Sequence, residues 1–364
     1  MSLNRTQGNV FPARPRRRHI CLVGTIPEPI GGVAIHIARL AELCVQSGYT
    51  TNIYDLHPGG TKWIPQGCTL ETKPTRWQAA VAYSFARRLR RFDLVHVHVS
   101  RLRTFLLLGL PTALNAGRLK RLVLTFHSGA LTEDLQTLSW IELSGISRIL
   151  RRCGKIVAVS ARQSEALQEI ARIANNKIAV IPAYLPVVHS SVPGIRERVE
   201  HRVVVASGYG TSLYGWHDLI MAIQRLPSTW QWVFCFYNSY EQAYYRRLRA
   251  ECGNIPNLRC FEDLDPARFH TILQEADTYV RPTASDGDSI ALREALALGL
   301  RCVASDVAIR PGGVVTYPVA SVDALCESLL RLPYGRQEQM EEQFGGRILR
   351  VYDEVYEANQ LLEH

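Results

Sequence analysis

The sequence predicts an α/β protein made of two Rossmann-like, doubly wound domains that face each other across a cleft. The chain of 364 residues is longer than one hydrophobic core normally serves, so two domains of ordinary size are expected. Short apolar runs alternate with helical patterns, which is typical of a parallel sheet covered by helices. The alternation stops at residues 183–200, a stretch with prolines and serines, and then begins again.

Each apolar run predicts one strand. The first series is ICLVG (20–24), LVHVHV (94–99), LVLTFH (122–127), KIVAVS (155–160) and KIAVIP (177–182). The second series is VVVAS (203–207), WQWVFCFY (230–237), LRCF (258–261), TYVRP (278–282), RCVAS (301–305) and VVTYP (314–318). We therefore expect an N-terminal domain at 1–186, a linker at 187–200, a C-terminal domain at 201–345 and a final helix at 346–364, with the ligand site in the cleft between the domains.

Composition favours a globular protein of the reducing cytoplasm. Hydrophobic residues make up 47% of the chain and charged residues 21%, without any low-complexity tract. The longest uncharged apolar run, at 104–117, is interrupted by Pro111 and is too short to span a bilayer, and the basic start at 14–19 leads into a strand rather than a signal peptide. The nine cysteines are odd in number and never form a C-x-x-C pair, so buried thiols are expected rather than disulfides or zinc ligands.

Positive charge is concentrated in the first half of a chain whose net charge is +9. Such clusters attract polyanions, namely nucleic acid, an anionic membrane face or phosphorylated small molecules, although a solvated basic face has the same composition. No zinc-finger or RNA-recognition motif accompanies them, so a nucleic-acid partner is not expected. The clusters are Arg14, Arg16, Arg17 and Arg18; Arg87, Arg88, Arg90 and Arg91; and Arg101, Arg103, Arg118, Lys120 and Arg121.

Two glycine-containing loops leave predicted strands. In GTIPEPIGG (24–32), Gly31 and Gly32 precede a helix at 31–47, where free N–H groups and the helix dipole favour an anion, although an ordinary turn would also use these residues. SGYGTSLYG (207–215), with Gly208, is the corresponding loop of the second domain. Neither loop has G-x-G-x-x-G spacing, which disfavours a dinucleotide-dependent oxidoreductase.

Three histidines lie at or near strand ends. His96 and His98 share one face of a strand, so a metal site with His127 is geometrically conceivable. No cysteine or carboxylate nearby completes a ligand set, and no metal is expected. His127 ends its strand at the edge where open α/β sheets bind ligands, and it can donate a hydrogen bond to a phosphate or a hydroxyl near neutral pH.

The segment RPTASDGDSIALREALALG (281–299) contains Asp286 and Asp288 just before a helix that carries Glu294. The two aspartates fit an Asp-X-Asp metal clamp, a helix cap or part of a sugar-nucleotide site. In chain order, GGVAIHIARLAE, LVHVHVS, LTFHSGA, KIVAVSARQSEAL and KIAVIPA come first and this segment comes last. The series resembles the GT-B-fold glycosyltransferases of family 4, over roughly residues 20 to 345. That family usually shows Glu-Gly-Phe-Gly and, four residues later, Glu-Ala-Met-Ala. Here Asp286 and Gly287 stand at the first acid and its glycine, and Glu294 stands at the second acid.

The resemblance implies transfer of a sugar from a nucleotide-diphosphate sugar to an acceptor hydroxyl, with retention at the anomeric carbon. Glu294 would accept hydrogen bonds from the ribose hydroxyls, Asp286 would contact sugar hydroxyls, and the leaving diphosphate would take the proton, without a metal. It also implies that the final helix packs back on the first domain. Gly31, Gly32 and His127 would serve from the first domain, and the backbone of Gly287, Asp288 and Ser289 from the second.

The sequence departs from the family pattern at the donor site. Asp286 replaces a longer glutamate, and Asp288-Ser289 replaces Phe-Gly. Tyr214-Gly215 stands where the family commonly shows Lys-Gly, so no basic residue of this loop can hold a diphosphate. Arg281 and Arg310 are our candidates for that task, and structural ion pairs are the other role open to them.

A basic amphipathic helix at 76–92 indicates a surface for an anionic membrane, with a lipid-linked or saccharide acceptor in bacterial-type polysaccharide or glycolipid synthesis. Basic residues also favour any helix C-terminus through the dipole. Two other functions remain open at this stage. One is a catalytically weak or inactive sugar-nucleotide-binding protein, and the other is a related epimerase or phosphorylase.

Overall fold

The structure is a computed structural model that describes residues 18–57, 59, 62–72, 89, 91–100, 102, 105–106, 119–185, 202–238, 241–335, 337 and 344–361. Most of the predicted helix at 76–92, the whole predicted linker at 187–200 and most of the arginine clusters lie outside these ranges.

The first domain is built on a parallel sheet of seven strands in the order β3-β2-β1-β4-β5-β6-β7. Since the sequence runs outward from β1 in one direction and from β4 in the other, the carboxyl ends of these two strands form the crevice where such sheets bind ligands. The strands are β1 (His19–Gly24), β2 (Thr50–Asp55), β3 (Thr69–Glu71), β4 (Leu94–Val99), β5 (Leu122–Phe126), β6 (Lys155–Ala158) and β7 (Ile178–Val180).

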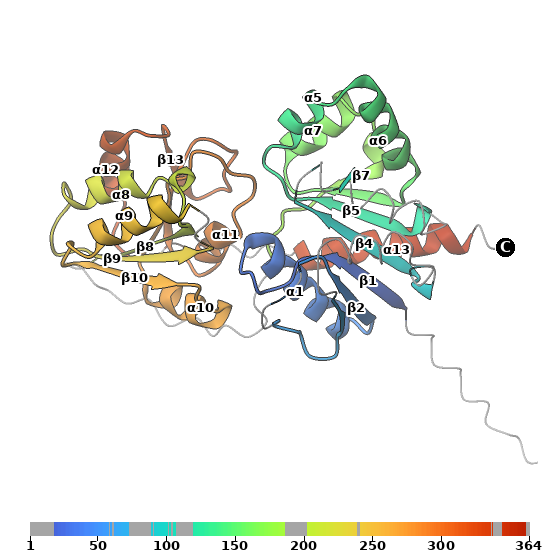
Figure 1. Cartoon of the computed structure of the whole chain (residues 1–364), viewed down its shortest axis with the longest axis horizontal. Coiled ribbons are helices and arrows are strands. Elements are labelled where there is room, and N and C mark those ends of the chain that lie inside the picture. The colour runs from blue at the N-terminus through green and yellow to red at the C-terminus, as the bar shows by residue number, and fades with distance from the viewer. Residues whose placement is uncertain are drawn as a thin grey trace, which may run out of the picture.

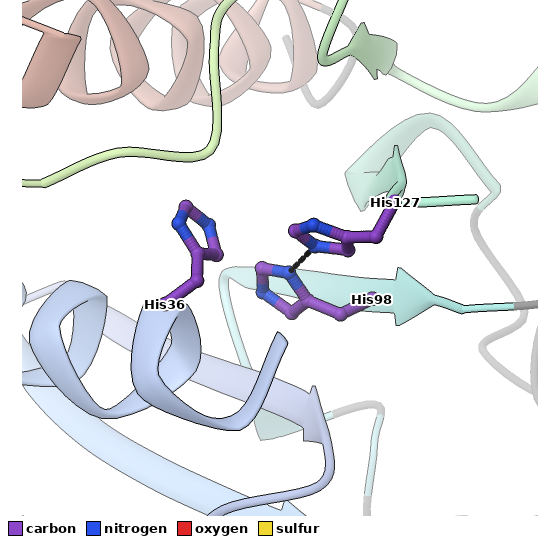
Figure 2. Close-up of side chains that lie close together, drawn as sticks. All are labelled: His36, His98 and His127. Carbon is purple, nitrogen blue, oxygen red and sulfur yellow. Dashed lines mark hydrogen bonds between the residues drawn. The ribbon is translucent and has the colours of Figure 1, made fainter. Parts of the chain in front are cut away.

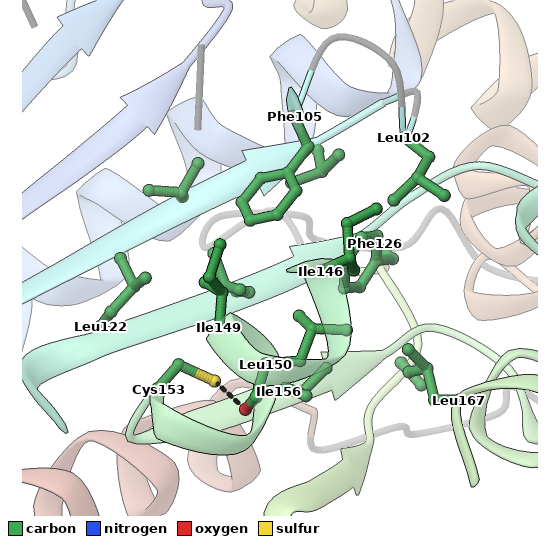
Figure 3. Close-up of a cluster of buried hydrophobic side chains, with 14 of the residues drawn as sticks. Leu102, Phe105, Leu122, Phe126, Ile146, Ile149, Leu150, Cys153, Ile156 and Leu167 are labelled. Carbon is green, nitrogen blue, oxygen red and sulfur yellow. Dashed lines mark hydrogen bonds between the residues drawn. The ribbon is translucent and has the colours of Figure 1, made fainter. Parts of the chain in front are cut away.

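Helices cover both faces of this sheet (Figure 1). Ile20 and Leu22 pack with α1 (Gly32–Gln46), whereas Cys21 and Val23 face the opposite layer, because successive side chains of a strand alternate between its faces. Figure 3 shows the core between the sheet and α6, where Leu122, Phe126 and Ile156 meet Ile149 and Leu150. That opposite layer consists of α5 (Leu131–Gln136), α6 (Trp140–Arg152) and α7 (Ala161–Glu169), and the short 3₁₀ turns are η3 (Leu119–Arg121) and η4 (Asn175–Lys177).

The second domain repeats the plan with six parallel strands in the order β10-β9-β8-β11-β12-β13. Its crevice lies between β8 and β11 by the same argument. The strands are β8 (Val203–Tyr209), β9 (Gln231–Tyr237), β10 (Leu258–Glu262), β11 (Thr278–Arg281), β12 (Arg301–Ser305) and β13 (Val314–Tyr317). The helices α8 (Trp216–Ile223), α9 (Gln242–Cys252) and α12 (Val322–Arg331) cover one face, α10 (Pro266–Glu275) and α11 (Ile290–Ala297) cover the other, and η5 spans Ser212–Tyr214.

The last helix, α13 (Phe344–Gln360), follows the second domain in sequence but packs on the first, as expected from the resemblance (Figure 1). Ile348, Val351 and Val355 are buried in the same core as Ile20 and Leu22. Tyr352 is buried as well, and its hydroxyl lies 2.6 Å from Nδ1 of His96 in β4. The chain therefore returns to the sheet from which it started.

All eleven predicted strands are present, and the helix predicted at 31–47 is observed at Gly32–Gln46. The prediction was wrong in omitting β2 and β3. β2 reads TTNIYD, with polar residues in its first half, and β3 is a three-residue strand at the sheet edge, so neither gives a continuous apolar run.

Two further features of the fold are the state of its cysteines and the hydropathy of its helices. All nine thiols are free, and all except Cys68 and Cys260 are buried. Within the described ranges, none of the helices combines the length and the apolar character needed to cross a membrane.

Candidate functional site

A cavity of about 450 Å³ lies between the two domains, at the carboxyl ends of both sheets. It collects residues that the sequence analysis named from distant segments of the chain. From the first domain it is lined by Gly31, Gly32 and His127; from the second, by Gly208, Arg281, Asp286, Gly287, Asp288, Ser289 and Glu294. Of the predicted site residues, only Arg310 does not line it, and Arg310 reaches it indirectly through Asp286.

The domains touch at this cavity through two glycines. A Cβ added to Gly129, in the loop after His127, would lie 2.6 Å from the carbonyl oxygen of Asp286. A Cβ added to Gly31 would lie 2.7 Å from the hydroxyl of Tyr209. Real Cβ atoms are not found at such distances. Because the neighbour of Gly129 is backbone, only glycine permits the domains to come this close there, whereas at Gly31 the Tyr209 side chain would have to move.

Asp286 is held by the two arginines that the sequence nominated for phosphate binding. Arg281 donates from Nε and Nη2 to the two carboxylate oxygens at 3.1 Å each, and Arg310 donates from Nη1 at 2.7 Å. Burial alone would raise the pKa of the Asp286 carboxyl, but the two guanidinium groups outweigh burial and hold that pKa below its ordinary value. Two cations meet one anion, so this buried cluster keeps an excess of one positive charge.

Tyr214 occupies the position of the missing lysine and packs against this cluster. The guanidinium carbon of Arg281 lies 4.8 Å from the centre of the Tyr214 ring, a cation–π arrangement. The same ring covers Gly208, where an added Cβ would lie 2.0 Å from Cδ1 of Tyr214. The loop therefore supplies an aromatic support for Arg281 in place of a charge of its own.

Asp288 joins the cleft to the end of the first domain. Its Oδ1 accepts a hydrogen bond from Nε of Arg293 at 2.6 Å, and its Oδ2 accepts one from the backbone N–H of Ala183 at 2.9 Å. Burial raises the pKa of the Asp288 carboxyl, and Arg293 offsets this only in part. These contacts leave no role for Asp288 as a cap of α11, because Ser289 is the N-cap residue and its side chain accepts from the N–H of Leu292.

Glu294 forms an ion pair across the domain boundary. Its Oε1 accepts from Nη2 of Arg39, a residue of α1, and both side chains are buried. Arg39 also donates from Nη1 to the carbonyl oxygen of Leu185 at 3.1 Å. The acid that the sequence assigned to a ribose thus already bonds to the first domain through one oxygen.

Four histidines lie beside the cavity on the first domain, in a chain of ring contacts. Figure 2 shows His36 on α1, His98 on β4 and His127, the residue that follows β5. Nδ1 of His98 and Nε2 of His127 form a hydrogen bond of 3.1 Å. His36 donates from Nδ1 to the carbonyl oxygen of Ala183 at 2.6 Å. The fourth ring, that of His96, lies 4.1 Å from the ring of His98.

Burial lowers the pKa of all four histidines, that of His36 to about 4. Mutual repulsion among the rings lowers the values of His96, His98 and His127 further, and the charge of Arg39 lowers that of His36. The rings are therefore neutral at neutral pH.

His36, His98 and His127 each place one nitrogen within 4.8 Å of the others, the one arrangement in the described chain that could hold a metal ion. No carboxylate or thiolate of the described residues joins the trio, and one nitrogen each of His98 and His127 is used in their mutual hydrogen bond. We assign the trio a hydrogen-bonding role on this geometry. A site without a metal remains our expectation.

The first domain also matches a known family. Residues 30–183 match the model described as Glycosyltransferase Family 4. These matched residues, the family 4 region, run from the loop before α1 to the residue that contacts Asp288. They include the first-domain residues that line the cavity, apart from Thr25 and Pro29.

Solved structures share the whole two-domain GT-B fold. A sucrose-phosphate synthase from Thermosynechococcus elongatus aligns with a TM-score of 0.62 and 15% identity over 95% of this chain and 98% of that one. Anabaena Alr3699/HepE, in complex with UDP and glucose, aligns with a TM-score of 0.63 and 15% identity over 85% and 88%. WaaG, a glycosyltransferase involved in lipopolysaccharide biosynthesis, aligns with a TM-score of 0.59 and 14% identity over 93% and 94%. A search of curated proteins gave no match.

Sequence reasoning missed several residues of the cavity. His36 and Arg39 lie on buried turns of α1 just after the Gly31-Gly32 pair, and two polar residues three positions apart on a buried helix were the available signal. Asn238 was also missed; it follows β9 and donates to the carbonyl oxygen of Ile30 across the domain boundary. Nothing in its local sequence marks that contact.

The buried histidines predict a loss of stability in mild acid. A depressed folded pKa means that the unfolded chain binds protons first, so stability is complete above pH 6.5, the ordinary value, and falls as the pH drops below it. Each histidine contributes up to about 1.4 kcal/mol per pH unit in that window. We expect His36→Asn, whose amide can replace the bond to Ala183, to flatten the pH dependence of the unfolding free energy between pH 6.5 and 4.5.

The exposed His217 provides the matched control, since His217→Gln changes a histidine whose side chain is half in solvent. Denaturant unfolding of the three proteins across this pH range measures the slopes. Equal slopes for wild type and His36→Asn would contradict the prediction.

Proposed function

We propose that the protein is a glycosyltransferase of the hexosyltransferase type, which transfers a sugar from a nucleotide-diphosphate sugar to an acceptor hydroxyl with retention of anomeric configuration. The observation that carries the proposal is the cavity between the domains. It joins the family 4 region to the Asp286 and Glu294 loop of the second domain, with almost every predicted site residue on its walls. Among structures with the same fold, HepE is described with UDP and glucose.

The donor would occupy the second-domain wall. Glu294 bonds to Arg39 through Oε1, which leaves its other oxygen for a ribose hydroxyl. The diphosphate would approach the N-terminus of α11, after Ser289, and the Arg281–Arg310 cluster with its excess positive charge. Protein cations would then compensate the diphosphate, and no metal is required in this scheme.

Retention is supported by the interactions that the acids lining the cavity already make. Asp286, Asp288 and Glu294 are each ion-paired with arginine. Arg281 and Arg310 hold the pKa of the Asp286 carboxyl below its ordinary value, and both oxygens of Asp288 already accept hydrogen bonds, from Arg293 and from the N–H of Ala183. Neither is therefore prepared to act as the base that inversion needs. The leaving diphosphate itself would take the acceptor proton, with attack on the same face of the sugar.

The acceptor would enter over the first domain, and we propose an anionic membrane as the surface where it is met. α6 carries Trp140 and Ile141, which are 79% and 64% exposed, and Arg148, Arg151 and Arg152 at its other end are exposed as well. Indole rings and arginines together suit the headgroup region of a bilayer. A lipid-linked or saccharide acceptor of bacterial-type polysaccharide or glycolipid synthesis fits this location, at the inner face of the membrane.

A sugar-nucleotide-binding protein without turnover is the second candidate, and Tyr214 is the observation that favours it. The residue stands where the family pattern has a lysine, and both nearby arginines already bond to Asp286. Such a protein would bind the donor and release no product. An epimerase would instead convert the donor without an acceptor.

The first experiment is thermal stabilisation by a panel of nucleotides and nucleotide sugars, with and without EDTA. A ligand at 100 times its dissociation constant adds about 2.7 kcal/mol to stability. We expect one base class to stabilise the wild type with or without chelator, and Glu294→Gln to weaken its affinity about 10-fold or more, because a hydrogen bond to a charged group is lost. Glu275→Gln, at an exposed acid of α10, should match the wild type.

Mass analysis of the products then separates the candidates. A new glycoside in the donor's anomeric configuration supports the transferase, and binding without product supports the second candidate. Absence of stabilisation by every member of the panel would contradict both.

The arginine cluster makes a separate prediction. Asp286→Asn removes the carboxylate that compensates Arg281 and Arg310, so the free variant should be less stable by about 3–5 kcal/mol, as when one partner of a buried ion pair is lost. Added pyrophosphate should stabilise this variant more than the wild type, because two uncompensated cations remain. Asp323→Asn, at an exposed ion pair with Arg225, is the control. Equal stabilisation of all three proteins by pyrophosphate would show that the arginines do not form the anion site.

Membrane association is tested by flotation with vesicles. We expect the protein to float with vesicles that contain phosphatidylglycerol, to stay behind with pure phosphatidylcholine, and to be released by high salt, because the attraction is electrostatic. The double variant Trp140→Ser/Ile141→Ser should float less, whereas Leu330→Ser, which changes an exposed apolar residue of the second domain, should not differ. If the protein floats equally with charged and uncharged vesicles, and the α6 variant floats as well as the wild type, α6 is not the membrane-binding surface.

A further inference from the structure

The hydrogen bond between His98 and His127 connects the interior of the first domain to the cavity. His98 is buried within β4, whereas His127 lines the cavity. Both rings have a pKa well below the ordinary value, mainly through burial, so each carries one proton at neutral pH. A hydrogen bond between two neutral imidazoles needs the proton on one side and a lone pair on the other.

The environment of the other nitrogen of His98, Nε2, decides whether His98 or His127 donates the proton of this hydrogen bond. Nε2 of His98 is fully buried and has no hydrogen-bond partner in the part of the chain described. If His127 donated from Nε2, the proton of His98 would sit on this unpartnered nitrogen, and a buried N–H without an acceptor is among the costliest defects in a folded protein. If His98 donates from Nδ1, its Nε2 bears only a lone pair, which costs less.

We propose that His98 is a positioning residue that donates from Nδ1 to Nε2 of His127 and so fixes the proton of His127 on Nδ1, as a hydrogen-bond donor for the ligand in the cavity. Nδ1 of His127 is not among the buried polar atoms without a partner, in contrast to Nε2 of His98. The ligand group that it meets is an oxygen acceptor, a sugar hydroxyl or a phosphate oxygen. The identity of that ligand rests on the proposed function, but the proton assignment does not.

The position of His98 is itself supported by α13. The ring of His96 packs 4.1 Å from that of His98, and His96 is held at both nitrogens, by the hydroxyl of Tyr352 at 2.6 Å and by that of Thr125 at 2.7 Å. Tyr352 belongs to the helix that returns from the second domain. A continuous set of contacts therefore leads from α13 through His96 and His98 to the cavity.

The consequence concerns both selectivity and chemistry. A histidine whose Nε2 accepts from His98 and whose Nδ1 carries the proton offers no free lone pair to a substrate. His127 thus acts as a donor and not as a general base, which agrees with proton transfer to the leaving diphosphate. A ligand whose matching group lacks an acceptor oxygen would leave this donor unpaired and bind more weakly.

The experiment is long-range ¹H–¹⁵N NMR on protein labelled with ¹⁵N-histidine, at neutral pH, which distinguishes the two neutral tautomers and the charged ring. The signals of His127 among the eleven histidines are identified by their loss in His127→Asn. We expect the proton of His127 on Nδ1 in the wild type and in His98→Asn, whose amide N–H can replace Nδ1–H of His98. In His98→Leu, which has no donor, we expect the fixed tautomer to be lost.

Binding provides the second measurement. For the nucleotide sugar that stabilises the protein best, the dissociation constant should rise about 3- to 10-fold in His98→Leu, the equivalent of one hydrogen bond, and change little in His98→Asn. A His127 ring that is protonated on Nε2, or charged, in the wild type would overturn the proposal. A common shift of His36, His98 and His127 on addition of zinc chloride would overturn it too, in favour of a metal site.

The wild-type spectrum reports the tautomer of His127 even if the His98 variants fail to fold. It also separates the two proposals. The tautomer can be as stated while no nucleotide sugar binds, in which case the proposed function fails alone. Nucleotide sugars can bind while His127 holds its proton on Nε2, in which case the positioning role fails alone.

Discussion

Charge that is buried between two domains has to be compensated, and this constraint organises the cleft. Asp286, Asp288 and Glu294 all come from the second domain, and each is neutralised by arginine. Glu294 draws its partner from α1 of the first domain, and Asp288 also accepts the N–H of Ala183. Removing one partner from such a pair costs far more than the pair contributes when intact. Glu294 and Asp288 therefore also hold the two domains together, whereas the carboxylate of Asp286 is compensated within the second domain.

The return of α13 has a related significance. A helix that only extended the second domain would leave part of the sheet face beside α1 uncovered, with apolar residues of the central strands such as Leu94 and Val123 closer to water. By packing there, α13 completes the core of the first domain and also brings Tyr352 to His96. Stability of the sheet and order at the cavity consequently depend on the same helix, although its residues follow those of the second domain in sequence.

The site differs from the family pattern in the source of its positive charge. A lysine in the loop after β8 would place a flexible ammonium near the donor, whereas here Tyr214 supports the planar guanidinium of Arg281 from a fixed ring. Arg281 and Arg310 are held by Asp286 before any ligand arrives. Because the two arginines are already held in place, less conformational entropy is lost when a ligand binds. The same arginines, however, are already paired with the carboxylate of Asp286. The affinity for an anionic ligand would then depend on how readily Arg281 and Arg310 exchange their hydrogen bonds from Asp286 to that ligand.

From the sequence one can predict both parallel sheets apart from β2 and β3, the helices α1 and α11, and the segments that meet at the cavity, because apolar periodicity is a local property of the chain. The cap of α11 was assigned from the structure, which shows Ser289 in that role and not an aspartate. The sequence also named most of the cavity wall, since the carboxyl ends of parallel strands share one edge. Only the tertiary structure decided which charges pair. Arg39 and Glu294 are separated by 255 residues, and no spacing along the chain records that α1 and α11 meet. The tautomer that we propose for His127 likewise depends on packing, because it follows from which nitrogen of His98 burial leaves without a partner.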